Sequence, residues 1–285
     1  MFTSSLDYGS GPGSSTGTPR VTTLFAKGTG RVNEDALLVG PGVYGVFDGA
    51  TSLGGSTYGG LTGGYLASRL AAGIFGSDDR PLAELAAAAN AAIRLKMEAL
   101  GVDLTRKEEL WSTSVAVVRR GRDRLEWCQT GDCRIQLIHG DGSSSQLVEV
   151  PDHDAETLHL WKKLGPGCHQ PIQVALAGKI LEVRRRMNID YGVLNGEREA
   201  LDFVRSGTVS LAGVSTVLLH TDGLSVPDPI TGQSHDQEML SRLFRHGGLQ
   251  AVHNHIRSLQ ENDPQCLIYP RFKVSDDISA IALCQ

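Results

Sequence analysis

Short apolar runs separated by turn residues dominate the chain from Arg20 onward. The runs are rich in Val, Leu and Ile and are bounded by Gly, Pro, Asn and Asp, which is typical of β-strands joined by short turns. The pattern predicts strands most clearly at residues 43–47, 113–118, 125–129, 134–139, 217–220 and 278–283.

A helical period interrupts this β-pattern after the first strands. Leu66, Leu70 and Ile74 recur at four-residue spacing and so share one helical face. An Ala-rich stretch then repeats the period with high helix propensity. Helices are predicted within residues 57–75, 82–100, 154–164 and 237–259.

The order of these elements predicts the fold class. Strands come in hairpin-like runs and helices in pairs, which indicates an α+β fold with mainly antiparallel sheets. Residues 1–19 are a Gly/Ser/Pro-rich stretch, predicted to be a flexible tail because they cannot bury enough apolar surface to offset their ordering entropy. Residues 20–285 are expected to form a single domain. Within it, residues 168–213 have no clean period and are interpreted as an insertion or lid.

Composition narrows the functional classes. The chain has 40% hydrophobic and 21% charged residues, which is globular, and its net charge of −5 is spread in mixed signs. No basic stripe is present, so nucleic acid is not expected as a partner. No apolar run approaches a membrane span and no signal peptide is evident, so a cytoplasmic protein is predicted. The five cysteines form no C-x-x-C pair and suggest neither a disulfide framework nor a zinc site.

Acidic residues stand at the ends of the predicted strands. Asp48 and Asp222 each end an apolar strand and are followed by glycine. Asp132 lies in the turn between two strands, and Asp276 precedes the last one. An isolated Asp-Gly pair is usually only a turn. Several carboxylates that converge across a sheet, however, need a cation between them, and hard oxygen ligands favour magnesium, manganese or calcium over zinc.

Six short motifs follow one another along the chain, and each is weak alone. They are Asn33-Glu34-Asp35, Val46-Phe47-Asp48-Gly49, Ser112-Thr113-Ser114-Val115, Thr130-Gly131-Asp132-Cys133-Arg134, His220-Thr221-Asp222-Gly223-Leu224 and Asp276-Asp277-Ile278-Ser279. In this order, over about residues 20–283, they resemble the metal-dependent protein phosphatases, the PPM or type 2C family, and the Asp-Gly-Ala-Thr at 48–51 resembles a bacterial subset. The resemblance implies a four-layer αββα sandwich of two packed, mainly antiparallel sheets flanked by helix pairs.

The resemblance also implies roles for the matched residues. Asp48 would bridge two Mg²⁺ or Mn²⁺ ions, and Gly49 would offer its carbonyl to one of them. Asp222 and Asp276 would bind the other, and Asp132 would complete a third, weaker site with Asp222. Two further residues, Glu34 and Asp35, would bind directly or through water. Asp277 would orient its neighbour rather than bind metal.

The chain departs from the family pattern at two points. The arginine that grips phosphate in the family has no exact counterpart, because Arg31 stands one position too close to Asn33, and Lys27 is a second candidate. Either could equally be a solvated surface cation. Ala50 replaces the histidine that follows Asp-Gly in many members, so a leaving group of low pKa or a metal-bound water is expected. His220 could shuttle protons, although an ordinary strand histidine is favoured.

The sequence thus predicts a hydrolase for phosphomonoesters. The leading expectation is a protein serine/threonine phosphatase that uses water activated between two metal ions, with Asp48, Asp222 and Asp276 as its catalytic core. A phosphoprotein substrate and a cognate serine/threonine kinase are the expected partners. The alternatives are a weak or inactive phosphatase-fold binding module and a phosphatase for a small metabolite.

Overall fold

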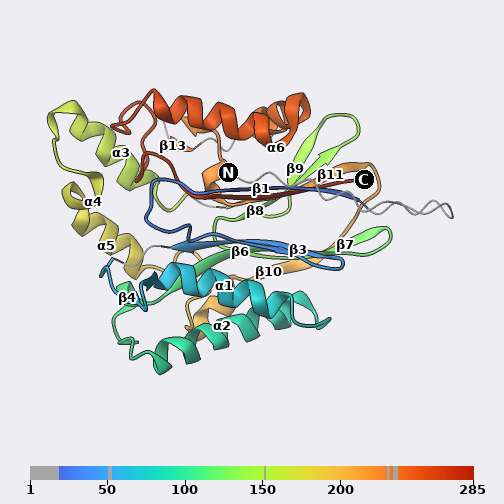
Figure 1. The fold of residues 1–285 in the computed structure, drawn as a ribbon, viewed down its shortest axis with the longest axis horizontal. Helices are drawn as coiled ribbons and strands as arrows, with labels where there is room; N and C mark the ends of the chain where they lie inside the picture. Colours follow the sequence, from blue (N-terminus) through green and yellow to red (C-terminus); the bar gives the residue numbers. More distant parts are fainter. Residues whose placement is uncertain (1–18, 51–52, 151, 230–231, 234–236) are drawn as a thin grey trace.

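The protein is built of four layers, with two β-sheets packed face to face between two outer helical layers (Figure 1). The computed structural model describes residues 19–50, 53–150, 152–229, 232–233 and 237–285. The predicted tail at 1–19 lies almost wholly outside the described residues. The α+β class and the four-layer arrangement agree with the sequence prediction.

One sheet pairs the first long strand with the last. Among the described residues it contains five strands in the order β1-β14-β11-β8-β9, and all neighbours are antiparallel. The predicted strands at 134–139, 217–220 and 278–283 all lie in it. Its strands are β1 (Arg20–Ala26), β8 (Arg134–His139), β9 (Ser144–Gln146), β11 (Val214–His220) and β14 (Ile278–Cys284).

The second sheet is also antiparallel throughout. In the described part of the chain it has five strands in the order β10-β7-β6-β3-β2, and it contains the other three predicted strands. The edge strand β10 falls in the region that had no sequence period. The strands are β2 (Ala36–Val39), β3 (Val43–Ala50), β6 (Ser112–Arg120), β7 (Arg124–Thr130) and β10 (Arg205–Ser210).

Alternate side chains of these strands build the two faces of each sheet. Val46, Ala116 and Val118 point between the sheets and meet side chains such as Ile135 and Leu219, all of them buried. The next residues along the strands face the helices instead. This period of two is what the alternating sequence pattern predicted.

Helices α1 (Gly63–Phe75) and α2 (Leu82–Ala99) cover the second sheet. Their apolar face packs on β3 and β6, with Phe75 and Ile93 fully buried. The helix expected within 57–75 begins only at Gly63. Residues before it form a small hairpin, β4 (Thr57–Tyr58) and β5 (Leu61–Thr62), because two glycines with positive φ, Gly59 and Gly60, make its turn.

Helix α6 (Gln237–Glu261) covers the first sheet on the opposite side (Figure 1). Its backbone leaves the helical region at Gly247 and Gly248, so this outer layer consists of two consecutive helical segments. Val252 and Ile256 bury its apolar face against β14 and β11. A minor pair, β12 (Pro227–Asp228) and β13 (Gly232–Gln233), precedes it.

The region with no sequence period contains short helices as well as the strand β10. Its helices α4 and α5 lie with α3 at one end of the sandwich (Figure 1). Its small apolar core joins Leu158 and Trp161 of α3 to Ile172 and to Phe272 near the last strand. The short elements are α3 (Ala155–Leu164), α4 (Ile172–Ala175), α5 (Ala177–Arg185) and the 3₁₀ turns Lys107–Glu109, Gly165–Gly167, Arg198–Phe203 and Asp222–Leu224.

Strand register brings the acidic motifs to this same end of the sandwich. In the first sheet His220, at the end of β11, pairs with Ala280 and with Arg134, so β11 ends where β8 and β14 begin. In the second sheet Asp48, at the end of β3, pairs with Ser114 near the start of β6. Motifs from both sheets therefore share one rim.

Candidate active site

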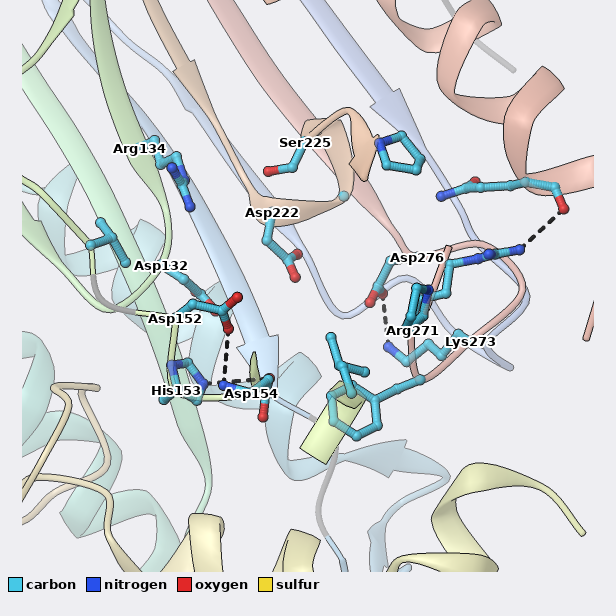
Figure 2. Close-up of a pocket in the computed structure, with 17 residues that line it drawn as sticks. Asp132, Arg134, Asp152, His153, Asp154, Asp222, Ser225, Arg271, Lys273 and Asp276 are labelled. Carbon is cyan, nitrogen blue, oxygen red and sulfur yellow. Dashed lines mark hydrogen bonds and ion pairs between the residues drawn. The ribbon is translucent and has the colours of Figure 1, made fainter. Parts of the chain in front are cut away.

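Four of the predicted aspartates line two adjoining cavities at the sandwich rim. Asp132, Asp222 and Asp276 line a small cavity of about 70 Å³ and also a larger one of about 620 Å³. Asp48 and Gly49 line the larger one. Figure 2 shows Asp222 and Asp276 pointing into the small cavity from neighbouring strand ends, with Asp132 across from them. Side chains far apart in the sequence thus meet as predicted.

Burial and neighbouring negative charges both change the pKa of Asp48. Burial raises its pKa well above the usual 3.8, and the carboxylates of Asp35, Asp222, Asp132 and Asp276 raise the pKa further. Alternation along β3 explains its direction, because Asp48 continues the face of Val46 that points between the sheets. An ionised Asp48 is therefore costly without a cation.

Asp35 lies behind the cavities, with 2% of its surface exposed. Burial raises its pKa well above the ordinary value. The hydroxyl of Thr221, which donates to Asp35 Oδ2 at 2.8 Å, lowers the pKa, whereas Asp276, Asp277 and Asp222 raise it. Asp35 thus belongs to the same electrostatic cluster, although it lines neither cavity.

Glu34 and Asp277 hold the segment that carries Asp35. The backbone N–H groups of Gly28 and Glu34 donate to the two oxygens of the Asp277 carboxylate, at 2.8 and 2.9 Å. Asp277 therefore fastens the β1–β2 connection to the start of β14, which supports the orienting role expected for it. The Glu34 carboxylate accepts from the Thr62 hydroxyl and is 5% exposed. Neither residue lines the cavities.

Two glycines beside the acids are required by close packing. A Cβ on Gly49 would lie 2.2 Å from the carbonyl oxygen of Gly64 at the start of α1. A Cβ on Gly223 would lie 1.9 Å from the carbonyl oxygen of Asp277. Both distances are below any real contact, so the Asp-Gly pairs serve to bring α1 and β14 close to the rim.

Lys273 is a site residue that the sequence analysis missed. Its Nζ lies 2.8 Å from Asp276 Oδ1, and its side chain lines both cavities (Figure 2). Burial opposes its charge, but attraction by Asp276, then Asp48 and Glu34, raises its pKa above the ordinary value. The available signal was the spacing Lys273-x-x-Asp276, which is too common on its own to indicate a site.

A second missed group lies beside Asp132. Arg134, Asp152, His153 and Asp154 all line the small cavity (Figure 2). Burial lowers the pKa of Arg134, whereas Asp132, Asp222 and Asp152 raise it. His153 stacks on Tyr191 with ring centroids 3.9 Å apart, which ties this loop to the segment after α5. The run Asp152-His153-Asp154 is a possible sequence signal, but the sequence pattern predicted only a helix that begins at Asp154.

The structure does not bring the two predicted phosphate-gripping residues to the cavities. Arg31 is exposed, and its guanidinium makes a 3.4 Å hydrogen bond to the carbonyl of Gly60. Lys27 is exposed as well and donates to the Arg31 carbonyl at 3.2 Å. Neither lines either cavity, because the β1–β2 connection turns their side chains toward the hairpin and solvent.

His220 and Cys133 are packed inside the fold. Burial lowers the pKa of His220 to about 4, which outweighs the opposite effect of the Thr221 carbonyl 3.0 Å from Nδ1, so the imidazole is neutral at pH 7. It lines neither cavity, which supports the interpretation as an ordinary strand histidine. Burial, aided by Asp48 and Asp132, raises the pKa of the Cys133 thiol, so this cysteine is an unreactive packed thiol.

The donor set fits hard divalent cations. It consists of carboxylates, and buried Asp132 Oδ1 has no hydrogen-bond partner among the described residues. In that part of the chain no group of three or more His, Cys, Asp or Glu side chains is already arranged to hold an ion. Carboxylates that repel one another are expected to draw together only around a cation. The residues that would hold it are Asp48, Gly49, Asp132, Asp222 and Asp276, with Glu34 and Asp35 behind them.

Comparison with solved structures identifies the fold. The chain is similar to the serine/threonine phosphatase PstP/Ppp of Mycobacterium tuberculosis, with 19% identity over 93% of this chain and 98% of that one and a TM-score of 0.58. The catalytic domain of PstP in complex with two manganese ions matches at 20% identity, over 93% and 97% of the two chains, with a TM-score of 0.57. The present chain therefore has the fold of these serine/threonine phosphatases.

Other comparisons agree or find nothing. The serine/threonine phosphatase Stp1 from Staphylococcus aureus matches at 16% identity, over 97% of this chain and 99% of that chain, with a TM-score of 0.58. No protein-family model matches the chain, and no curated protein matches its sequence. Within the described residues, no helix has the length and apolar character needed to cross a bilayer. The similarity therefore establishes the fold, and the chemistry depends on the rim residues.

Proposed function

We propose that this chain hydrolyses phosphomonoesters, chiefly phosphoserine and phosphothreonine in proteins, with two Mg²⁺ or Mn²⁺ ions and a weaker third. The observation that carries the proposal is the convergence of Asp48, Asp132, Asp222 and Asp276 on adjoining cavities. The phosphatase fold and the two manganese ions named for the PstP catalytic domain support it.

The carboxylates would hold the ions, with Asp48 between them and Asp222 and Asp276 on one side. Ions bound there would supply an activated water and neutralise phosphate oxygens. The chain itself supplies rigid strand ends, which fix the spacing of the carboxylates. Asp277 keeps the β1–β2 connection in place and so positions Asp35 and Glu34.

Ala50 carries no titratable group at the position that follows Asp48-Gly49. His220 is neutral and lines neither cavity. Without a histidine at residue 50, the leaving oxygen is expected to take its proton from water or to depart with a low pKa. We infer that substrates with good leaving groups, such as aryl phosphates, turn over faster than alkyl phosphates when both bind equally well.

The substrate class is proposed from the larger cavity. It extends from Asp48 to α5, where Ile180, Leu181 and Val183 form an apolar wall. This wall lies in the region interpreted as an insertion or lid, which fits a role in recognising residues next to the phosphorylated one. A small phosphorylated metabolite is the second candidate, since about 620 Å³ lies within the usual size of small-molecule sites.

Manganese-dependent hydrolysis tests the function. The wild-type chain should release phosphate from para-nitrophenyl phosphate and from phosphothreonine peptides only with Mn²⁺ or Mg²⁺ added. Asp48→Asn should lose at least about 10³-fold in rate, because the shared ligand is gone. The matched control is Asp141→Asn, which changes an exposed aspartate in the β8–β9 turn and should leave the rate unchanged.

Two results would redirect the proposal. Metal binding without hydrolysis of any phosphopeptide would favour the binding-module alternative. Hydrolysis of small phosphorylated metabolites in preference to phosphopeptides would favour the metabolite phosphatase.

We also propose, from the sequence, a cytoplasmic location and a serine/threonine kinase that phosphorylates the same substrates.

A further inference from the structure

A phosphatase of this kind needs a cation that meets the substrate phosphate, and the predicted residues do not reach the site. Arg31 and Lys27 are exposed on the β1–β2 connection and line neither cavity. A phosphate group brings about two negative charges into a rim that is already acidic. Metal ions would offset part of that charge, and a basic side chain close to the aspartates would offset more of it and orient the phosphate.

Among the described residues, three lysine or arginine side chains line the small cavity and three line the larger one. Arg134 and Arg271 belong only to the small cavity, and Arg106 and Arg184 only to the larger one. Among the described residues, Lys273 is the lysine or arginine that lines both. It therefore lies where the two cavities join, next to the carboxylates.

The neighbours of Lys273 leave its ammonium group available. Its Nζ makes one 2.8 Å contact with Asp276 Oδ1, and its side chain is 30% exposed. An ammonium group has three donors, and Asp276 uses one of them. A metal ion on Asp276 would weaken the attraction of Asp276 for Lys273, and the ammonium group would then be able to donate to a phosphate oxygen.

A rigid loop fixes the lysine. Arg271 is held by a 2.7 Å ion pair to Asp263, and it donates to the carbonyls of Gln260 and Val274 on either side. The backbone of Asp276 accepts a 2.7 Å hydrogen bond from Arg257 of α6. Lys273 thus projects from a loop anchored before and after it, which limits the entropy lost when it binds a ligand.

We propose that Lys273 is the residue that binds the substrate phosphate, in the role that the sequence suggested for Arg31 or Lys27. The inference rests on the proposed function for its biological meaning, but its chemistry is the binding of a phosphate dianion. Lysine acts here as a point charge, so the phosphate keeps rotational freedom that a bidentate arginine would restrict.

Phosphate binding tests this directly. Inorganic phosphate is titrated into the manganese-loaded protein by calorimetry for wild type, Lys273→Met, Lys273→Arg, Arg31→Met, Lys27→Met and Arg184→Met. Lys273→Met keeps the stem but removes the charge, and it should weaken phosphate binding about tenfold, as expected for one charge-assisted hydrogen bond. Lys273→Arg should restore most of the affinity. The other three variants should stay within about twofold of wild type.

Manganese binding in the same variants separates phosphate binding from a merely structural role. Lys273→Met should bind Mn²⁺ at least as tightly as wild type, because a competitor for Asp276 is removed. Weaker manganese binding would mean that Lys273 acts by holding Asp276, and this would overturn the proposal. Unchanged phosphate affinity in Lys273→Met, or a larger loss in Arg31→Met, Lys27→Met or Arg184→Met, would overturn it as well.

The test also distinguishes this proposal from the proposed function. If wild type binds phosphate through Lys273 but hydrolyses no phosphate ester, the function fails and the assignment of Lys273 stands. If the manganese-loaded wild type binds no phosphate at all, the assignment fails whether or not hydrolysis occurs.

Discussion

Asp263 and Asp48 have opposite electrostatic environments. Asp263, at the end of α6, is 3% exposed and receives backbone N–H groups of Leu267, Ile268 and Tyr269 together with the Arg271 guanidinium. Although burial opposes its ionisation, these donors hold the pKa of Asp263 below its usual value. Asp48, at the rim, meets mainly other carboxylates, and its pKa is raised.

The contrast separates a structural acid from an acid built for a ligand. The protein supplies Asp263 with enough donors to stay ionised, so this residue needs nothing further. It gives Asp48 more negative charge instead, so the ionised form is complete only with a cation from outside. A carboxylate whose pKa is raised by neighbouring carboxylates is therefore a better sign of a metal site than acidity itself.

Breaking the ion pair between Asp263 and Arg271 should have the largest effect on stability. Arg271→Met removes the ion pair and leaves Asp263 buried without its cation, which should lower the free energy of unfolding by about 3–5 kcal/mol. Urea denaturation of the metal-free protein measures it. Arg245→Met, which changes an exposed arginine on α6, is the control and should cost less than about 0.5 kcal/mol. Equal losses of stability in the two variants would mean that the Asp263–Arg271 ion pair contributes no more than an exposed arginine does.

The raised pKa values of Asp35 and Asp48 should make stability depend on pH and metal together. Because the folded pKa values of Asp35 and Asp48 are raised, their contribution to stability is full below their usual 3.8 and is lost as pH rises through the raised values. Manganese binds the ionised carboxylates, so its stabilisation grows with pH.

Thermal unfolding measures this effect. At a manganese concentration 100 times its dissociation constant, the stabilisation should be about 2.7 kcal/mol. At one fixed total concentration it should be larger at pH 8 than at pH 5.5. Asp48→Asn should flatten the difference, and an equal manganese effect at both pH values in wild type would contradict the proposed environment of the cluster.

Crowding at the rim can be tested at Gly49. Gly49→Ala places a methyl group against the Gly64 carbonyl and should cost about 1–3 kcal/mol of stability, because neither backbone segment can move freely. Gly73→Ala is the matched control. It lies on the exposed side of α1 with no atom within 4 Å of the added Cβ, and it should stabilise by about 0.5–1 kcal/mol. Denaturant midpoints compare the two variants.

Removing the charge of Asp48 should raise the stability of the metal-free protein rather than lower it. Asp48→Asn removes one repelling charge and should stabilise the metal-free protein by about 1 kcal/mol while it abolishes hydrolysis. Denaturation in the presence of a chelator gives the value. A loss of stability instead would mean that Asp48 has protein partners that satisfy it, as Asp263 does.

The sequence predicted the fold and the aspartates for a physical reason. Strand periodicity and the positions of Asp48, Asp132, Asp222 and Asp276 at strand ends are local features, and the register of antiparallel sheets then brings strand ends together. The resemblance to metal-dependent phosphatases is confirmed as a likeness of fold. The roles of the individual residues remain predictions.

The cation beside the aspartates could not be predicted in the same way. Lys273 sits in a loop whose path is set by the Asp263–Arg271 pair, and nothing in the local sequence fixes that path. Arg31 lies near the expected position in the sequence, yet the β1–β2 connection turns it toward Gly60. Spacing in the sequence predicts which side chains share one face of a strand. It does not predict where the side chains of a loop point.

The position of β14 has a consequence for biosynthesis. This strand lies between β1 and β11, and Asp277 at its entrance binds the backbone of the β1–β2 connection. A chain still on the ribosome has made β1 long before its neighbour exists, so the first sheet and its rim can close only after residue 284 has been added. Nascent chains should therefore be inactive and exposed to chaperones until translation has passed that strand.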